Sequence, residues 1–337
     1  MSKLAFLGDV YLKYEKNLIN VPEPFIFNYE CVATTADAKP MINKINLRGK
    51  MDFSGFSNLP MAVNLANNHI LDYLDKGVQD TIKVLKDNQV NYFGAGTRED
   101  NYNNPCMLSI EGKQIALLGY NDITHSLEQE SIVYQTARPD EAQIKRDIDL
   151  CKQQGAEQII IHIHWGREER FWNTKRQQDL GRLFIDLGAS LVIGHHSHCI
   201  QPVECYKGRY IFYGLGNAYF PDIAVSAYYN STGESEFVMH KKHFRYGRQS
   251  LKVVYDIEEK DVVSIRFMEL KGNELLDKGE VRYDKAVSKI YQNQFINNLT
   301  GYAHMLALFV RGYLFTDGKL FSLKAIKKEL EFLKNRK

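Results

Sequence analysis

Three histidines stand within four positions of this sequence, His195, His196 and His198, at the end of the apolar run 191–193. Neutral imidazole nitrogens are common ligands of zinc, iron and manganese in proteins. His196 and His198 are two residues apart, a spacing that puts both side chains on one face of an extended segment. The cluster therefore predicts a metal site with His196 and His198 among its ligands.

A second pair with the same spacing, His162 and His164, ends another apolar run. A lone histidine at a strand end is more often a hydrogen-bonded structural residue than a ligand. We interpret His162 in this way, because its neighbours make it a strand-interior position. His164 stands at the end of its run and, together with the Asp9 carboxylate, joins the candidate ligands.

Oxygen ligands are available from the carboxylates of Asp9 and Glu30 and from the amide of Asn68. Several histidines, two carboxylates and one asparagine suit two divalent ions that share a bridging carboxylate. Two such ions can hold the attacking and leaving oxygens of a phosphoryl displacement and activate water near neutral pH. Two alternatives stay open: Glu30 is an ordinary solvated carboxylate, and Asn67 caps the helix that follows it.

The elements that must position these residues are strands alternating with helices, the pattern of an α/β domain. Apolar runs predict strands at 4–7, 61–65, 114–120, 155–164, 189–198 and 209–217. Helical spacing of apolar residues predicts helices at 76–88, 140–154 and 174–187. The polar residues that follow strands are Asp9, Asn68, His69, His164 and His196. Because ligand sites in α/β sheets collect beyond the carboxyl ends of the strands, we expect these side chains to converge.

The composition is that of an ordinary globular protein: of 337 residues, 44% are hydrophobic and 25% charged, with a net charge of +2. This charge predicts no nucleic-acid partner. The five cysteines are scattered without a CxxC pair, so we expect neither a disulfide framework nor a thiolate zinc site. We predict a cytoplasmic protein, because "MSKLAFLGDV" does not have the pattern of a signal peptide and no apolar stretch is long enough to cross a membrane.

Residues 250–270 predict two strands joined by a charged turn. From Tyr283 onward the pattern is helical, and we expect a helical C-terminal appendage of residues 275–337 beside a domain of residues 1–274. The final segment, "LKAIKKELEFLKNRK", is basic and amphipathic. Such a helix lies on an anionic membrane surface, as a peripheral contact, or packs on its own domain or on a second copy of the chain. These alternatives stay open.

Seven stretches come in an order and at a spacing that resemble the CapA family: "FLGDVYL", "FNYE", "NLANNHILDY", "YFGAGT", "IHWGREE", "VIGHHSHCIQPVE" and "YGLGNAYF". That family is named for poly-γ-glutamate capsule synthesis and belongs to the calcineurin-like metallophosphoesterase superfamily. The resemblance covers residues 3–222. It implies an α/β fold in the form of a four-layer α/β/β/α sandwich of the metallophosphoesterase type, with the metal site at the sheet edge.

The resemblance also implies roles for single residues. The implied metal ligands are Asp9, Glu30 as the bridging carboxylate, Asn68, His164, His196 and His198. His69 resembles the histidine that faces the scissile group and is implied to be catalytic. The residues expected to bind substrate or to support the ligands are Asn67, Arg167, Glu168, His195 and Asn217. Arg167 is included for its chemistry, because an anionic substrate needs cations near the metals.

In one position the sequence departs from the superfamily. The first motif is DxH, and here its third residue is Tyr11, so that one ligand of the first metal is absent. The implied cofactor is accordingly one or two divalent transition-metal ions, which are manganese, iron or zinc.

These patterns predict a metal-dependent hydrolase of the CapA type that acts on a phosphoester or on a substrate related to a capsule or surface polymer. Its partner would be an anionic small molecule or polymer. One alternative is γ-glutamyl amide chemistry in poly-γ-glutamate-type capsule synthesis. Another is a non-catalytic scaffold of a surface-polymer assembly complex. His69, beside a full set of ligands for the second metal, favours an enzyme over a scaffold.

Overall fold

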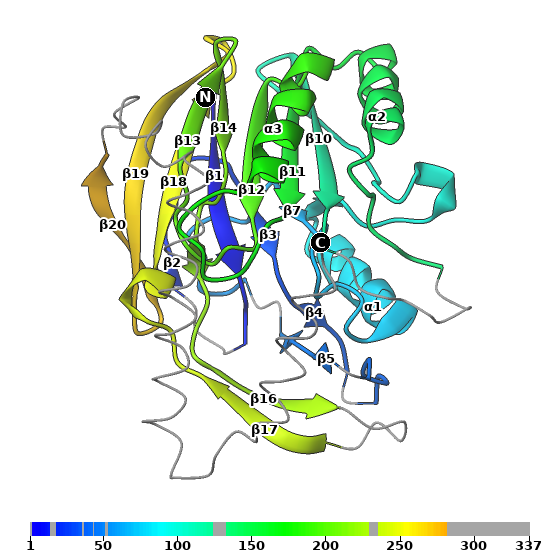
Figure 1. Cartoon of the computed structure of the whole chain (residues 1–337), viewed down its shortest axis with the longest axis vertical. Coiled ribbons are helices and arrows are strands. Elements are labelled where there is room, and N and C mark those ends of the chain that lie inside the picture. The colour runs from blue at the N-terminus through cyan, green and yellow to red at the C-terminus, as the bar shows by residue number, and fades with distance from the viewer. Residues whose placement is uncertain are drawn as a thin grey trace.

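Two β-sheets lie face to face in the computed structural model, which describes residues 2–13, 18–35, 37–42, 44–50, 53–123, 133–228 and 235–281 (Figure 1). The larger sheet has the order β2 (Leu18–Ile19), β20 (Glu274–Glu280), β19 (Asp261–Lys271), β18 (Gln249–Asp256), β1 (Lys3–Val10), β3 (Phe25–Tyr29), β7 (Ala62–Asn64) and β8 (Asn91–Phe93), with β15 (Asn217–Tyr219) also paired to β1. The smaller sheet has the order β13 (Val203–Tyr206), β14 (Arg209–Phe212), β12 (Leu191–His195), β11 (Gln158–His164), β10 (Lys113–Asn121) and β9 (Cys106–Ile110).

The alternation of side chains along the strands builds the core between the two sheets. In β1, Leu4 and Phe6 pack in one cluster with Leu117 and Ile160 of the smaller sheet. Ala5 and Leu7 of β1 belong to a separate cluster on the opposite face. Because successive side chains of a strand point to opposite faces, both faces of each sheet must be covered by apolar partners.

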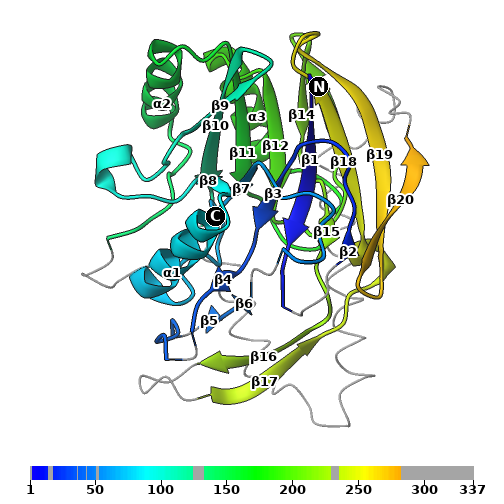
Figure 2. The same ribbon diagram turned by 180° about the vertical axis from the view of Figure 1, so that it is seen from behind.

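Helices cover the outer faces, α1 (Leu74–Asp87) on the larger sheet and both α2 (Glu141–Gln153) and α3 (Lys175–Leu187) on the smaller (Figures 1 and 2). The three predicted helices are confirmed to within two residues at each end. The helix starts show why: the side chains of Asp140 and Thr174 accept hydrogen bonds from the third residue of α2 and of α3. The predicted mixed α/β fold is therefore confirmed.

Parallel strands of the two sheets end at the same edge of the molecule. In the larger sheet β1, β3 and β7 run parallel, and in the smaller sheet β10, β11 and β12 do so. Figure 1 shows that the arrowheads of both groups point to the same edge. A small sheet of β17 (Ser235–Lys241), β16 (Ile223–Tyr228) and β5 (Lys44–Ile45) lies beyond this edge (Figure 1). The short strands β4 (Val32–Ala33) and β6 (Arg48–Gly49) pair nearby.

The C-terminal part of the described chain corrects one predicted boundary. The two strands predicted within 250–270 are confirmed as β18 and β19. A turn with Gly272 at φ 61° leads directly into β20, so residues 275–280 belong to the larger sheet and not to a helical appendage. The predicted helices from Tyr283 onward lie outside the described residues. Within the described ranges, no helix is long and apolar enough to span a bilayer.

Candidate metal centre

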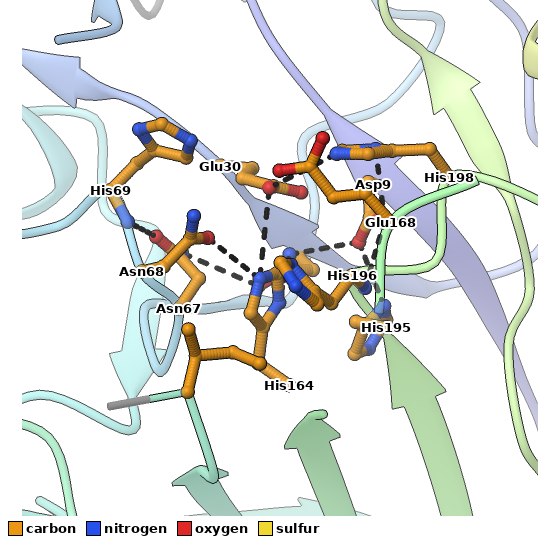
Figure 3. A network of polar contacts seen from close by, with 12 residues as sticks. Asp9, Glu30, Asn67, Asn68, His69, His164, Glu168, His195, His196 and His198 are labelled. Atoms are coloured by element: carbon orange, nitrogen blue, oxygen red, sulfur yellow. Dashed lines mark hydrogen bonds and ion pairs between the residues drawn. The ribbon is translucent and has the colours of Figure 1, made fainter. Parts of the chain in front are cut away.

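The predicted ligands meet between the two sheets at the carboxyl edge of the parallel strands (Figure 3). Two groups have potential ligand atoms within 4.8 Å of one another, Glu30–His164–His196 and Asp9–Glu30–His198. All five residues are buried. Glu30 is common to both groups, which is the arrangement required of a carboxylate shared by two ions.

Glu30 follows β3 directly and is 0% exposed, so the alternative of a solvated carboxylate is wrong. Among the described residues neither of its carboxylate oxygens has a hydrogen-bond partner. Its Oε1 lies 3.7 Å from His164 Nε2 and 3.6 Å from His198 Nε2. Burial first, and then the charges of Asp9 and Glu168, raise the pKa of Glu30 well above its ordinary value. A buried carboxylate without partners is costly, and divalent cations would remove that cost, so the donor set fits a metal site.

Asp9 is held by hydrogen bonds at the end of β1. Its Oδ1 accepts a hydrogen bond of 2.9 Å from Asn28 Nδ2 and lies 3.1 Å from His195 Nδ1. Its Oδ2 accepts one of 3.2 Å from the backbone N–H of His196. Burial acts to raise the pKa of Asp9, but its contacts with the imidazoles of His195 and His198 and with the amide of Asn28 outweigh it, so the pKa is lowered. Asp9 is therefore ionised and oriented.

The histidine loop differs from the extended segment that the sequence predicted. β12 ends at His195, and both His196, with φ 84°, and His198, with φ 53°, adopt left-handed backbone conformations. Such conformations are uncommon for residues other than glycine and concentrate at functional sites. The two side chains consequently do not share one face: His196 joins the group of Glu30 and His164, whereas His198 joins that of Asp9.

Asn217, at the start of β15, orients His198. Its Nδ2 donates a 2.8 Å hydrogen bond to the Gly247 carbonyl, which leaves its Oδ1 as the acceptor that lies 2.8 Å from His198 Nδ1. The His198 ring then carries a proton on Nδ1, and in the neutral ring Nε2 keeps a lone pair on the side of Glu30. The structure thus places Asn217 behind a candidate ligand rather than at the substrate side.

The loop after β7 supplies the asparagines. Asn68 Oδ1 lies 2.8 Å from His164 Nε2, on the same side as Glu30. Asn67 donates a hydrogen bond of 2.8 Å to the Tyr29 carbonyl and accepts one of 2.9 Å from the backbone N–H of His69. Helix α1 begins only at Leu74, so the alternative in which Asn67 caps it is wrong. Asn67 instead shapes the loop that presents its two neighbours.

His69 lies beside the centre with its proton position fixed by a neighbour that the sequence analysis missed. His69 Nδ1 is 2.7 Å from Asp72 Oδ2, and Asp72 also forms an ion pair with Lys44 and accepts a 2.6 Å hydrogen bond from the backbone N–H of Leu47. Burial outweighs the charge of Asp72 and lowers the pKa of His69. The i, i+3 spacing in "NHILD" is the sequence signal that would have found Asp72.

The remaining predicted residues lie at the mouth of the centre. Glu168 is near His198 (Figure 3), and its side chain is 45% exposed and forms a 3.1 Å ion pair with Lys241 of β17. Arg167, next to it, is exposed and lies outside both ligand groups. Asn68 and His69 are each 8% exposed, whereas Glu30 and His164 are fully buried. The centre is therefore approached from the side of these two loops.

Tyr11 supplies no ligand. Its side chain packs in the cluster on the outer face of the larger sheet, its ring lies 5.3 Å from that of Phe220, and its hydroxyl donates a 3.1 Å hydrogen bond to the Arg48 carbonyl. The Asp9 side of the centre therefore has three candidate ligands, which agrees with the departure from DxH seen in the sequence.

Known proteins match this chain over the region that builds the centre. The family described as "Bacterial capsule synthesis protein PGA_cap" matches residues 7–222. The capsule biosynthesis protein CapA of Bacillus anthracis is 35% identical over 166 residues, and the PGA biosynthesis protein CapA of Bacillus subtilis (strain 168) is 31% identical over 159 residues. Each alignment covers 47% of this chain, and 39% and 42% of these two relatives. The chain thus spans about two fifths of the length of the relatives it matches.

Among solved structures, the 5'-nucleotidase precursor from Thermus thermophilus aligns with a TM-score of 0.38 and 13% identity, covering 92% of this chain and 59% of that one. A similarity at this level supports no inference about activity.

Proposed function

The chain belongs to the bacterial capsule synthesis protein family PGA_cap, as its motifs predicted, and we propose that it is a metal-dependent hydrolase with a two-ion centre. We further propose that its two sheets and outer helices are the α/β/β/α sandwich of the metallophosphoesterases. The observation that carries the proposal is the position of Glu30, a fully buried carboxylate without hydrogen bonds to the described residues that lies in both groups of candidate ligands.

The chain's own residues divide between the two ions. Glu30 would bridge them, with Asp9 and His198 on one side and His164, His196 and Asn68 on the other. Divalent ions bound here would supply Lewis acidity and would lower the pKa of water into the neutral range. Manganese, iron and zinc all accept this mixture of imidazole, carboxylate and amide ligands.

His69 is the residue proposed to face the leaving group, where it protonates that group or stabilises the transition state. Its Nδ1 is engaged by Asp72, so that Nε2 is the nitrogen left to face a substrate. Asp72 is proposed as a positioning residue. Its Oδ1 forms an ion pair with Lys44, which fixes the orientation of the carboxylate and so of the His69 ring. At the mouth, Lys241 and Arg167 provide positive charge for an anionic substrate, with Glu168 as the present partner of Lys241.

A phosphoester is the bond that two adjacent ions suit best, and the family name associates the substrate with a capsule polymer. The two other functions predicted from the sequence are γ-glutamyl amide chemistry and a scaffold without turnover. Both give different results in the experiment below. The cytoplasmic location, the absence of a nucleic-acid partner and a peripheral membrane or homo-oligomer contact of the C-terminal residues stay predictions.

The test combines metal analysis with a substrate panel. Protein purified without chelator or histidine tag, and loaded with manganese, is assayed on phosphomonoester, phosphodiester and γ-glutamyl chromogenic compounds. We expect up to two ions per chain and phosphoesterase activity. His69→Asn should keep the ions and lose about 10²- to 10⁴-fold in activity, the usual contribution of a general acid. His240→Asn, at an exposed histidine of β17, is the control.

Each other outcome identifies an alternative. Turnover of the γ-glutamyl compounds alone would replace the phosphoester by an amide. Full metal loading with no turnover of any compound, together with binding of an anionic polymer, would support the scaffold. Protein that binds no ion after manganese, iron and zinc have been offered would refute the hydrolase.

A further inference from the structure

A pair of buried histidines stands behind Asp9, on the side away from the mouth of the centre. His162 Nδ1 lies 3.0 Å from His195 Nε2, and the two rings are stacked with centroids 5.2 Å apart. His195 Nδ1 lies 3.1 Å from Asp9 Oδ1. The three side chains therefore form a continuous polar chain that runs from the core between the sheets to the carboxylate.

The order of donors along this chain follows from its end. Asp9 acts as an acceptor, because Asn28 and the backbone N–H of His196 already donate to its two oxygens. His195 Nδ1, 3.1 Å from Asp9 Oδ1, therefore faces an acceptor, and in a neutral ring with its proton on Nδ1 the lone pair is on Nε2. His162 must in turn donate from Nδ1 to that lone pair. The last nitrogen, His162 Nε2, has no hydrogen-bond partner among the described residues.

Packing alone does not account for His162. Its ring centroid lies 5.2 Å from that of Phe93 and 5.5 Å from that of Phe6, and Ile160 of the same strand points into the same cluster. An apolar side chain would fill this position without burying an unpartnered nitrogen, which costs free energy. Within the described ranges, the single polar contact that the His162 ring makes is the one to His195, so His195 is the reason for an imidazole at this place.

His195 does not itself belong to either ligand group of the described residues. Its contact is with Asp9 Oδ1, the same oxygen to which Asn28 donates, whereas Oδ2 lies 3.7 Å from His198 Nδ1. Asp9 Oδ1 is thereby occupied by the protein, and Oδ2 is the oxygen on the side of the other ligands. Partners behind a metal ligand commonly fix its orientation and raise metal affinity.

We propose that His162 and His195 are positioning residues, a relay of two imidazoles that both carry their proton on Nδ1 and hold Asp9 in its metal-binding orientation. The inference rests on the proposed metal centre. It explains why the "GHHSH" cluster contains His195 besides the two candidate ligands, and why position 162 is a histidine. It also gives the Asp9 side a rigid support where Tyr11 contributes no ligand.

Metal affinity tests the relay through a variant that keeps the core filled. His162→Leu should bind one of the two ions about 10- to 100-fold more weakly in competition with a chromogenic chelator, the usual effect of losing such a partner. In a His195→Gln background, His162→Leu should cause no further loss, because the relay is already broken. Ile160→Val, on the same strand and facing the same cluster, is the control and should leave the affinity unchanged.

The proton positions can be measured without any metal, in the ¹⁵N-histidine-labelled apo protein. Long-range ¹H–¹⁵N spectra should show a proton on Nδ1 of both His162 and His195 and none on Nε2 of His195, and His162→Leu should change the pattern of His195. A proton on Nε2 of His195, or wild-type affinity in His162→Leu, would overturn the relay while the metal centre stands. Failure of the wild type to bind any ion would overturn the proposed function, and with it the role of the pair.

Discussion

The two sides of the candidate metal centre share Glu30 but are supported in different ways. On the Asp9 side, Asn28 and His195 contact Asp9, and Asn217 contacts His198, so that both unshared ligands are held from behind. On the other side His164 contacts Asn68 and, at 3.5 Å, Asn28, but Nδ1 of His196 has no hydrogen-bond partner within the described part of the chain.

The two sides show that the number of ligands in a metal site and the contacts that hold those ligands in place are separate properties. The Asp9 side has fewer candidate ligands but more contacts behind them, whereas the His196 side adds an amide oxygen and leaves Nδ1 of His196 without a hydrogen bond to the described residues. Preorganised ligands lose less conformational entropy on binding. We therefore expect the two ions to bind with distinct affinities and the Asp9 side to depend most on residues behind the ligands.

The largest effect is expected from substitution of Glu30, the carboxylate shared by both ligand groups. Glu30→Gln should abolish binding of both ions, because each group loses its common carboxylate. Chelator should lower the thermal midpoint of the wild type but not of this variant; ions at 100 times their Kd stabilise by about 2.7 kcal/mol. Elemental analysis and thermal melts with and without chelator measure this. Glu157→Gln, at an exposed carboxylate paired with Lys113, is the control, and two ions retained in Glu30→Gln would contradict the shared position.

His196 and His198 each belong to one ligand group alone, so their substitution distinguishes the two sides of the centre. His198→Ala and His196→Ala should each lose one ion per chain and keep the other, since they belong to different groups. Metal content per chain, measured at equal free manganese, is the readout. If either substitution removes both ions, the two sides are not independent and the comparison fails.

A smaller effect is expected from the residue behind His198. Asn217→Ala should weaken the ion on the Asp9 side by about 10- to 100-fold and leave the other unchanged, because the His198 proton is no longer fixed on Nδ1. Titration with manganese resolves the two affinities. Asn103→Ala, which removes a buried asparagine bonded to Asp147, with neither residue in contact with the candidate ligands in any hydrogen bond described above, should lower stability without changing metal affinity. Equal losses of affinity in both variants would argue for a general loss of structure.

The smallest effect is expected at Tyr11. Tyr11→Phe removes the hydrogen bond to the Arg48 carbonyl and should cost about 1 kcal/mol of unfolding free energy. Metal content should not change, because this side chain points away from the centre. Denaturant melts and elemental analysis check both statements, and a loss of bound metal would place Tyr11 nearer to the ions than the structure does.

The convergence of Asp9, Asn68, His164 and His196 could be predicted from the sequence, because each follows an apolar strand and parallel strands bring such ends together. The place of Glu30 in the ligand set came from the family resemblance. The helices and the strands of residues 250–270 follow from periodicity and caps in the same way.

Among the supporting residues, Asn67, His195 and Asn217 were expected from the family resemblance. The contacts of Asn28 and His162 could not be predicted, because they depend on how strands pair and how backbones turn. Asn28 reaches Asp9 across the register of β1 and β3, and His162 reaches His195 across that of β11 and β12. No local pattern fixes these registers. The left-handed backbone at His196 and His198 was missed for a similar reason, since neither residue is a glycine that would signal it.

The place of β1 in the larger sheet governs when the centre can be assembled during biosynthesis. β1 pairs with β3 on one side and, on the other, with β18, where Phe6 lies opposite Val253 and Leu4 opposite Tyr255. Contacts this distant along the chain form slowly, because a long loop must close first. Asp9 is made long before β18, so its strand has both neighbours only after residue 256 has been made. The proposed metal centre would therefore be completed only in the final stage of the protein's folding, when nearly the whole described chain is present.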